Sequence, residues 1–233
     1  MRKPNTKNIL LVVQRDNFKK DIPFLSGLTD EFKRLGYEIH LHKPVALGLR
    51  SMLDSKGRFY KLPFPLRFLC KTFVFITKPS LWKRCFKRQW SESLLIADRC
   101  RRLKKHISRF GSNVNLIVLA RSAGARVSSL IANETNINKL ICLGYPFKHP
   151  EKPAEIERYQ HLPFIKVPFL IIQGTDDVYG GSEIESLYHF APNTSIKFIE
   201  ASHEFKITRD QLSIVLYYIN DFISVEKMES VYP

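Results

Sequence analysis

Short apolar runs alternate with helical segments along almost the whole chain of 233 residues. Six runs have the length and β-branched content of strands: residues 8–14, 37–42, 114–119, 139–143, 167–173 and 195–200. The spacing of apolar residues predicts helices over residues 21–35, 91–109, 127–133, 182–190 and 211–225. Such alternation favours right-handed crossovers and a parallel sheet that is covered on both faces. We therefore expect one α/β domain over residues 1–233, with a doubly wound, mainly parallel sheet of about six strands.

The run at residues 114–119 (VNLIVL) is continuous, which predicts a strand buried on both faces, whereas the alternating run at 37–42 predicts a strand nearer an edge. After residues 114–119 the chain reads ARSAGAR and then becomes helical. A strand that turns directly into a helix leaves the residues between them at the carboxyl edge of the sheet. The first backbone N–H groups of the helix can then face a ligand. Ser122 is therefore a candidate nucleophile or, alternatively, a helix N-cap.

Two other strand ends carry the groups that a nucleophilic serine requires. Asp176 and Asp177 follow the run at 167–173, and His203 follows the run at 195–200. A serine nucleophile needs a base, and that base needs an acid to orient it. In an open parallel sheet, ligands bind beyond the carboxyl ends of the strands, where the strand order reverses. If the first strand lies beside the run at 114–119, Ser122 lies at that point.

Four segments together carry a family resemblance: LIVLARSAGARVSSLIA (116–132), LICLGYPFKHPEKP (140–153), HLPFIKVPFLIIQGTDDVYG (161–180) and ASHEFK (201–206). They resemble the α/β-hydrolases, and more narrowly the short branch typified by dienelactone-hydrolase-like and testis-expressed hydrolase-like proteins. The resemblance implies the α/β-hydrolase fold, in which the nucleophile, acid and base follow in this chain order. It implies Ser122 as nucleophile, His203 as base and Asp177 as the orienting acid. In that family the acid is usually the fourth residue counted from Gly174, which favours Asp177 over Asp176.

The chain departs from the family pattern at two places. Ala120 replaces the first glycine of G-x-S-x-G, and alanine is small enough for the turn. The loop after the first strand normally contains a glycine and donates one N–H to the oxyanion, but here it reads QRDNFKK. The backbone N–H of Ala123 is the other expected donor, and the N–H of Arg15 or Asp16 or the Gln14 amide could complete the pair. Losing one such donor costs on the order of a hundredfold in rate.

The resemblance and the residue types around Ser122 also suggest which residues bind substrate: Gln14, Arg121 and Tyr145. Arg121 and Arg126 could reach an acidic group of the substrate, or they could be surface residues paired with Asp or Glu.

Positive charge is concentrated in one part of the chain. Residues 43–110 contain 18 Lys or Arg and 3 acidic residues, whereas the remaining chain has 19 of each. Residues 59–90 interleave nine aromatic residues with lysines and arginines. We consider three roles for this insertion, residues 43–90: a lid over the acyl pocket, a patch that contacts an anionic membrane, or a single-strand nucleic-acid surface. The last is disfavoured because no RNA-binding motif accompanies it.

The cysteines and the apolar runs indicate which bound groups and which cellular location to expect. The four cysteines are widely spaced with no C-x-x-C, so neither zinc, nor any other metal, nor a disulfide framework is expected. We expect a cytoplasmic protein, because the apolar N-terminal run is too short for a signal peptide and no run approaches a membrane span. The expected function is a serine hydrolase that needs no cofactor and acts on a small ester or related acyl substrate. The alternative is a non-catalytic hydrolase-fold protein that binds an anionic membrane surface or acidic partner through its basic segment.

Overall fold

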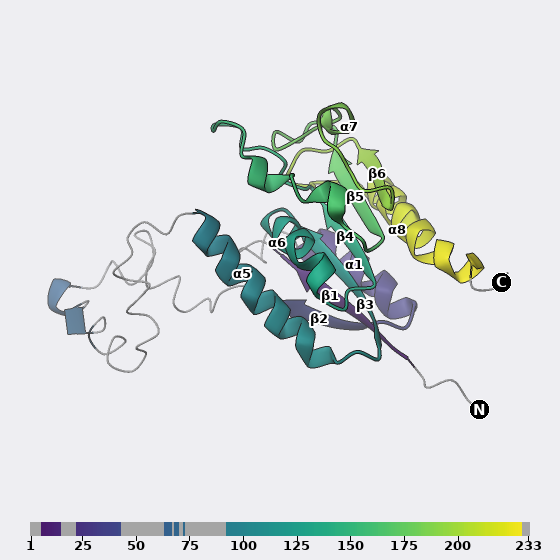
Figure 1. Cartoon of the computed structure of the whole chain (residues 1–233), viewed down its shortest axis with the longest axis horizontal. Coiled ribbons are helices and arrows are strands. Elements are labelled where there is room, and N and C mark those ends of the chain that lie inside the picture. The colour runs from purple at the N-terminus through teal and green to yellow at the C-terminus, as the bar shows by residue number, and fades with distance from the viewer. Residues whose placement is uncertain are drawn as a thin grey trace.

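A computed structural model of the chain describes residues 6–14, 22–42, 63–66, 68–69, 72 and 92–229 (Figure 1). In these residues six strands form one sheet in which every neighbouring pair is parallel. The strands are β1 (Lys7–Val13), β2 (Glu38–His42), β3 (Val114–Arg121), β4 (Lys139–Leu143), β5 (Phe169–Gly174) and β6 (Thr194–Ile199). All six predicted strands are present, with ends that differ from the prediction by two residues or fewer.

The described helices are α1 (Ile22–Arg34), α5 (Glu92–Ile107), α6 (Ala123–Ile131), α7 (Ile184–Leu187) and α8 (Arg209–Glu229). Short 3₁₀ segments cover Ser108–Phe110, Ala132–Glu134, Ile156–Arg158 and Leu162–Phe164. The α6 helix begins four residues before its predicted start, because its first turn consists of small residues and an arginine that carry no apolar periodicity. The α7 helix is shorter than predicted, with Ser182, Glu183 and the residues after Leu187 outside it.

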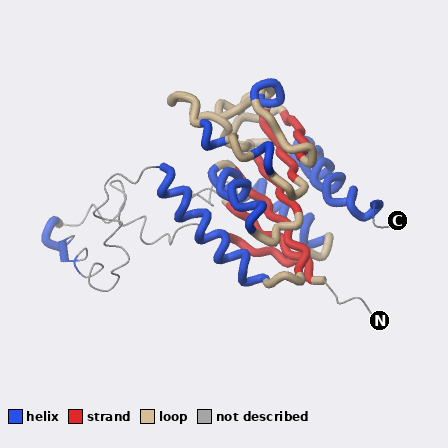
Figure 2. The backbone as a smooth tube through the Cα atoms, viewed as in Figure 1, coloured by secondary structure: helices blue, strands red, loops and turns tan. Residues whose placement is uncertain are grey.

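The strand order is β2-β1-β3-β4-β5-β6. The order reverses between β1 and β3, which pair from Lys7 with Val114 to Val13 with Ala120. Ser122, the residue after β3, therefore lies at the switch point, which meets the condition set in the sequence analysis that the first strand lies beside this one. The β2 strand lies at an edge, as its alternating pattern indicated. Figure 2 shows helices on both sides of the strands, which is the doubly wound arrangement.

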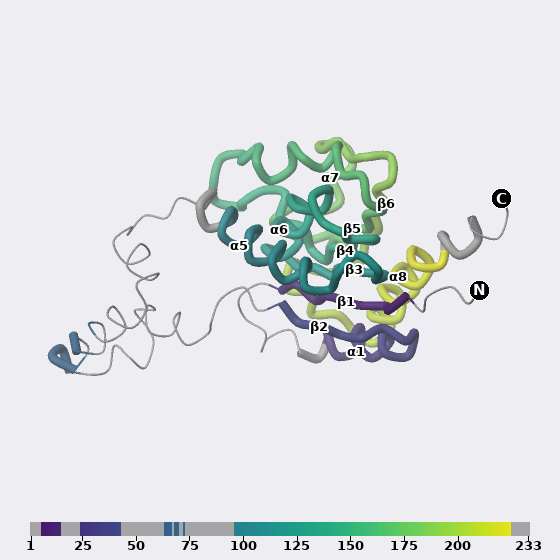
Figure 3. Tube along the Cα trace, turned by 60° about the horizontal axis from the view of Figure 1, so that its bottom comes forward, coloured from purple at the N-terminus to yellow at the C-terminus, as the bar shows by residue number. Residues whose placement is uncertain are grey.

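Each face of the sheet has its own hydrophobic core. On one face α5 and α6 pack over β3 side chains such as Val118 and Ala120. On the other face α1 and α8 pack over the alternate side chains, such as Ile117 and Leu119. Figure 3 shows the strands between α5 and α6 on one side and α1 and α8 on the other. The strand ends beyond these two cores hold the polar residues of the site.

The expected insertion at residues 43–90 lies outside the described residues, apart from 63–66, 68–69 and 72. Among these, the side chains of Phe64, Phe68 and Leu69 are exposed.

Candidate active site

Ser122 occupies a strained turn between β3 and α6. Its φ is 51° and its ψ is −121°, and a positive φ is costly for a residue with a Cβ atom. The Ser122 side chain makes no capping hydrogen bond to the helix. Its Oγ instead lies 2.8 Å from Nε2 of His203. Ser122 thus occupies the N-cap position of α6, but its hydroxyl does not cap the helix and is directed to the histidine.

Small residues on either side of Ser122 allow this turn to pack against the sheet. A Cβ atom added at Gly124 would collide with the carbonyl oxygen of Val13 and lie 2.9 Å from its carbonyl carbon. Ala120 is completely buried. Alanine, a small residue, thus stands where the family pattern has a glycine.

His203 and Asp177 come from the loops after β6 and β5. His203 Nδ1 lies 2.8 Å from Oδ2 of Asp177. The same oxygen accepts a hydrogen bond from Gln173 Nε2 at 3.0 Å, and Oδ1 accepts one from the Tyr179 backbone N–H at 2.8 Å. Asp176, in contrast, is exposed. Of the two carboxylates, Asp177 is the one that contacts His203.

Backbone contacts hold the β5 and β6 loops together. The backbone N–H of Thr175 donates to Ile199 O at 2.9 Å, and that of Asp176 donates to Ala201 O at 3.2 Å. A Cβ atom at Gly174 would collide with the carbonyl oxygen of Ala201, so only glycine allows this approach. The two loops that supply the histidine and its carboxylate therefore form one packed unit.

The contacting groups are shielded from water. Asp177 is 3 % exposed, His203 7 % and Ser122 8 %. The ring of Tyr179 lies beside the imidazole, with 4.4 Å between the ring centroids. Because Nδ1 faces a carboxylate, it carries the proton of the neutral imidazole, which leaves Nε2 as an acceptor for the Ser122 hydroxyl. This arrangement can remove a proton from the hydroxyl and hold the resulting imidazolium against Asp177.

The N-terminus of α6 provides donors next to Ser122. The first helical hydrogen bonds run from the backbone N–H groups of Ala125 and Arg126 to Ser122 O, at 2.9 and 3.3 Å. The N–H groups of Ala123 and Gly124 precede these bonds and so lack an acceptor within the helix. Arg15, the other expected oxyanion donor, lies outside the described residues.

Gln14 follows β1, the strand paired with β3, at the same edge of the sheet as Ser122. It is 2 % exposed, and neither its amide nitrogen nor its amide oxygen has a hydrogen-bond partner among the residues that the structure describes. A buried amide without partners is costly, which makes this side chain a candidate for a polar group that arrives with the substrate.

The two arginines near Ser122 are not surface residues. Arg121 is 2 % exposed and Arg126 8 %, so the alternative that they lie at the surface is wrong for both. The Nη2 atom of Arg121 donates to the carbonyl oxygens of Glu204 at 2.6 Å and of His203 at 3.3 Å. The guanidinium is thus directed to the His203 loop.

Tyr145 lies in the core. It is fully buried, and its hydroxyl donates to Arg158 O at 2.6 Å. The pKa of Tyr145 is raised well above its usual value, mainly because burial disfavours the phenolate. These contacts direct its hydroxyl to the Arg158 backbone within the core.

Gln173 is a member of the site that sequence analysis missed. It is fully buried at the end of β5 and donates from Nε2 to Asp177 Oδ2 and to Gly180 O, while its Oε1 accepts from the Tyr145 backbone N–H at 2.8 Å. Gln173 therefore fixes the Asp177 carboxylate from the strand end. The only signal in the sequence was a glutamine within an otherwise apolar strand.

Comparisons with known proteins agree with this fold. A family model described as an alpha/beta hydrolase domain matches residues 91–214, more than half of the chain. The chain belongs to the α/β-hydrolase family. A search of curated proteins found no match.

Solved structures of other α/β-hydrolases share the fold of this hydrolase at low sequence identity. A dienelactone hydrolase from Anabaena variabilis has a TM-score of 0.58 at 15 % identity, covering 94 % of this chain and 86 % of its own. A serine hydrolase homologue from Coxiella burnetii has a TM-score of 0.56 at 13 % identity, covering 90 % and 81 %. A serine hydrolase without a lid from Xanthomonas campestris has a TM-score of 0.52 at 12 % identity, covering 95 % and 84 %.

Within the described part of this hydrolase, no group of three or more His, Cys, Asp or Glu side chains is placed to hold a metal ion. None of the helices in that part is long and apolar enough to cross a membrane.

Proposed function

We propose that this hydrolase cleaves an ester or related acyl bond of a small molecule through a triad of Ser122, His203 and Asp177. The observation that carries the proposal is the continuous chain of contacts from Ser122 Oγ through the imidazole to the Asp177 carboxylate, with 2.8 Å at each step. The positive φ of Ser122 adds support, because strain of this kind clusters at functional sites.

In the proposed reaction Ser122 Oγ attacks the substrate carbonyl carbon while His203 Nε2 accepts the hydroxyl proton. The negative charge that develops on the carbonyl oxygen is stabilised by the backbone N–H of Ala123 at the start of α6. The imidazolium then gives its proton to the leaving oxygen, and the acyl group remains on Ser122. Water, deprotonated by the same imidazole, attacks this acyl-enzyme and releases the acid and free Ser122. Asp177 stays ionised and stabilises the imidazolium in both halves.

The second oxyanion donor is proposed to be the Gln14 amide or the backbone N–H of Arg15. Burial of the unpartnered Gln14 amide at the β1 end supports the first choice. A donor that finds its acceptor only as charge develops favours the transition state over the bound substrate.

A fluorophosphonate probe tests the nucleophile, because it reacts only with an activated serine. Wild-type protein should be labelled, whereas Ser122→Ala and His203→Ala should not. Ser128→Ala is the matched control, since Ser128 is a fully buried serine of α6 whose hydroxyl has no partner within the described part of the chain. Undiminished labelling of Ser122→Ala would remove the nucleophile assignment, and no labelling of folded wild type would remove the enzyme assignment.

A second candidate function is peripheral contact with an anionic membrane surface, with or without catalysis. It is favoured by the exposed Phe64, Phe68 and Leu69 within the strongly basic stretch of the chain. Apolar side chains can enter the headgroup region while Lys and Arg meet anionic lipid. A cytoplasmic location is part of this proposal, and the free thiols of Cys100 and Cys142 in the described residues are compatible with it.

A further inference from the structure

Arg121 is the last residue of β3 and directly precedes Ser122. Side chains alternate between the two faces of a strand. Ala120 and Val118 face α5 and α6, whereas Leu119 and Ile117 face α1 and α8. Arg121 continues the second series, so its side chain lies on the sheet face opposite α6.

On that face the guanidinium meets the loop that carries His203. Its Nη2 donates to the carbonyl oxygens of His203 and Glu204, which are consecutive residues. These two residues are the central pair of a turn, because the backbone N–H of Phe205 donates to Ser202 O at 3.0 Å. The Arg121 side chain therefore fixes the two peptide groups that directly follow His203.

The turn ends in a residue with an unfavourable backbone conformation. Phe205 has a φ of 47° and is 2 % exposed, and its ring lies under the Arg121 guanidinium, 5.8 Å from the guanidinium carbon to the ring centroid. A left-handed aromatic residue persists only where its surroundings hold it. The same ring packs against Phe24 of α1, with 5.8 Å between ring centroids, and against Gly144 at the end of β4. Arg121 and these neighbours enclose Phe205 on several sides.

Removing the guanidinium would leave two buried or half-buried carbonyl groups without their donor and would open space beside Phe205. The loop would then relax, and His203 would turn away from Ser122 Oγ. A misplacement of about 1 Å can cost about a hundredfold in rate even when the altered residue does not touch the substrate.

We propose that Arg121 is a positioning residue that holds the His203 loop so that Nε2 stays aligned with Ser122 Oγ. This inference rests on the proposed serine-hydrolase function. It replaces the expectation that Arg121 binds an acidic group of the substrate.

The test uses the full chain with p-nitrophenyl acetate as substrate and ¹⁵N-labelled histidine for NMR. Arg121→Met should lower kcat about a hundredfold and leave KM unchanged, since the side chain does not meet substrate. Arg121→Lys keeps a charge but loses the planar fork that can serve two carbonyls, so it should restore part of kcat. The downfield proton on His203 Nδ1, bonded to Asp177, should broaden or shift in both variants.

Arg158→Met is the matched control, because Arg158 is another buried arginine but contacts Glu155, outside the His203 loop. It should lower the free energy of unfolding and leave kcat and the His203 resonance unchanged. If Arg121→Met does not fold, Arg121→Lys decides: wild-type kcat together with an unchanged resonance would overturn the proposal. A raised KM at constant kcat in either Arg121 variant would overturn it in favour of substrate binding.

The two proposals fail separately. If folded wild type neither turns over ester nor reacts with fluorophosphonate, the proposed function fails, and the NMR comparison still reports whether Arg121 sets the position of His203. If wild type is active and the Arg121 variants match it in kcat and resonance, only the positioning role fails.

Discussion

Asp177 is held through both of its carboxylate oxygens. One carboxylate oxygen accepts from Gln173 and faces His203 Nδ1, and the other accepts from the Tyr179 backbone N–H. These contacts fix the orientation of the carboxylate group. The consequence is that His203 has a single favourable orientation and a single favourable tautomer.

Replacing Asp177 by Asn should therefore lower kcat by about 10⁴-fold, because the amide favours the wrong imidazole tautomer. Asp176→Asn is the matched change one residue away, at an exposed side chain, and should leave kcat within about twofold of wild type. Both rates are measured with an activated ester. Reversed effects of the two substitutions would show that the acid has been assigned to the wrong carboxylate.

Ser122, His203 and Asp177 could be predicted as a set because each follows its own strand and because the family resemblance ordered them. The roles of Arg121, Tyr145 and Gln173 could not. Whether a side chain next to the nucleophile meets substrate or core depends on which sheet face it occupies. The sequence alone does not show which helices cover each face of the sheet, and so it does not show what such a side chain meets. Tyr145 follows β4 closely enough to reach the edge, yet its ring turns inward to Arg158.

At the scale of elements, the contact between β1 and the first turn of α6 places the nucleophile. Gly124 lies directly against the carbonyl group of Val13, and Ser122 is two residues away. A backbone carbonyl group within a strand cannot move aside for an added methyl group, whereas the end of a flexible side chain can. The position of α6 therefore depends on the absence of a Cβ atom at residue 124.

Gly124→Ala should lower the free energy of unfolding by about 1–3 kcal/mol and should lower kcat, because α6 must move away from β1. Urea unfolding and ester turnover measure the two effects. Gly27→Ala is the control: it adds the same methyl group within α1, where the nearest atom is the flexible end of Leu212. Its contact cost is offset by the gain in helix propensity of about 1 kcal/mol. Equal loss of stability in both variants would contradict the assigned role of the β1–α6 contact.

The existence and order of the elements were predictable from periodicity, but some of their ends were not. The α6 helix starts at Ala123, and only tertiary contact with β1 explains why small residues begin it. The neighbour relation between β1 and β3 was a condition of the prediction rather than a result, because no local pattern encodes which strands pair. The pairing of β1 with β3 confirms that condition.

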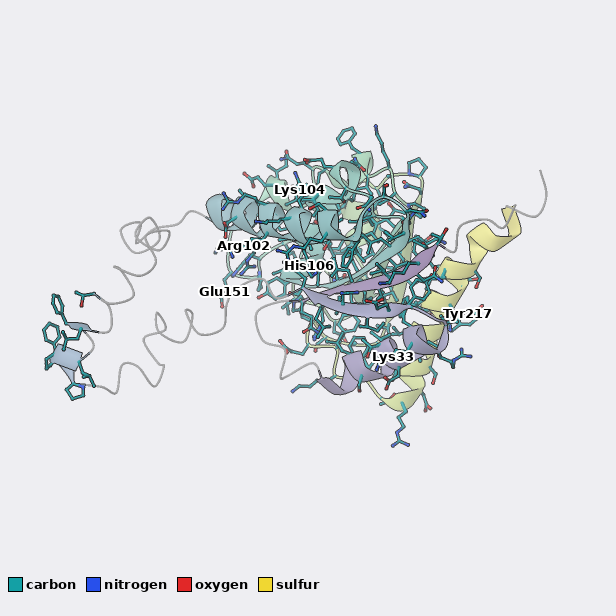
Figure 4. All side chains as sticks on the ribbon, turned by 90° about the horizontal axis from the view of Figure 1, so that it is seen from below. Lys33, Arg102, Lys104, His106, Glu151 and Tyr217 are labelled. Carbon is teal, nitrogen blue, oxygen red and sulfur yellow. The ribbon has the colours of Figure 1, made fainter. Side chains whose placement is uncertain are left out.

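At the scale of the whole molecule, charge is divided unevenly. The excess of basic residues falls entirely within residues 43–110, and the described end of this segment is α5. Figure 4 shows Arg102 and Lys104 along α5, with Lys33 and Tyr217 on other elements. Exposed charges interact over about 8 Å at physiological ionic strength, so any anionic surface they meet must lie close.

The membrane proposal predicts binding to vesicles that contain phosphatidylserine, with binding lost as salt is raised. Replacing Lys83, Arg84, Lys87 and Arg88 by Ser should weaken vesicle binding by up to about a thousandfold, at about 1 kcal/mol for each residue. Turnover of a small ester should not change. Co-sedimentation with vesicles measures the first effect. If wild-type protein does not bind anionic vesicles at low salt, the membrane proposal is wrong. If the four-residue variant instead loses activity on an acidic substrate, the segment acts as a lid.

In the proposed mechanism Ser122 becomes acylated during turnover. The most direct measurement is mass spectrometry of the protein quenched in the presence of p-nitrophenyl acetate, followed by mapping of the acetyl group. We expect one acetyl group per chain on Ser122, which accumulates rapidly in wild type and is absent from Ser122→Ala and His203→Ala. Turnover of the ester with no acetyl group on Ser122, or with acetylation of another side chain at the wild-type rate, would contradict it.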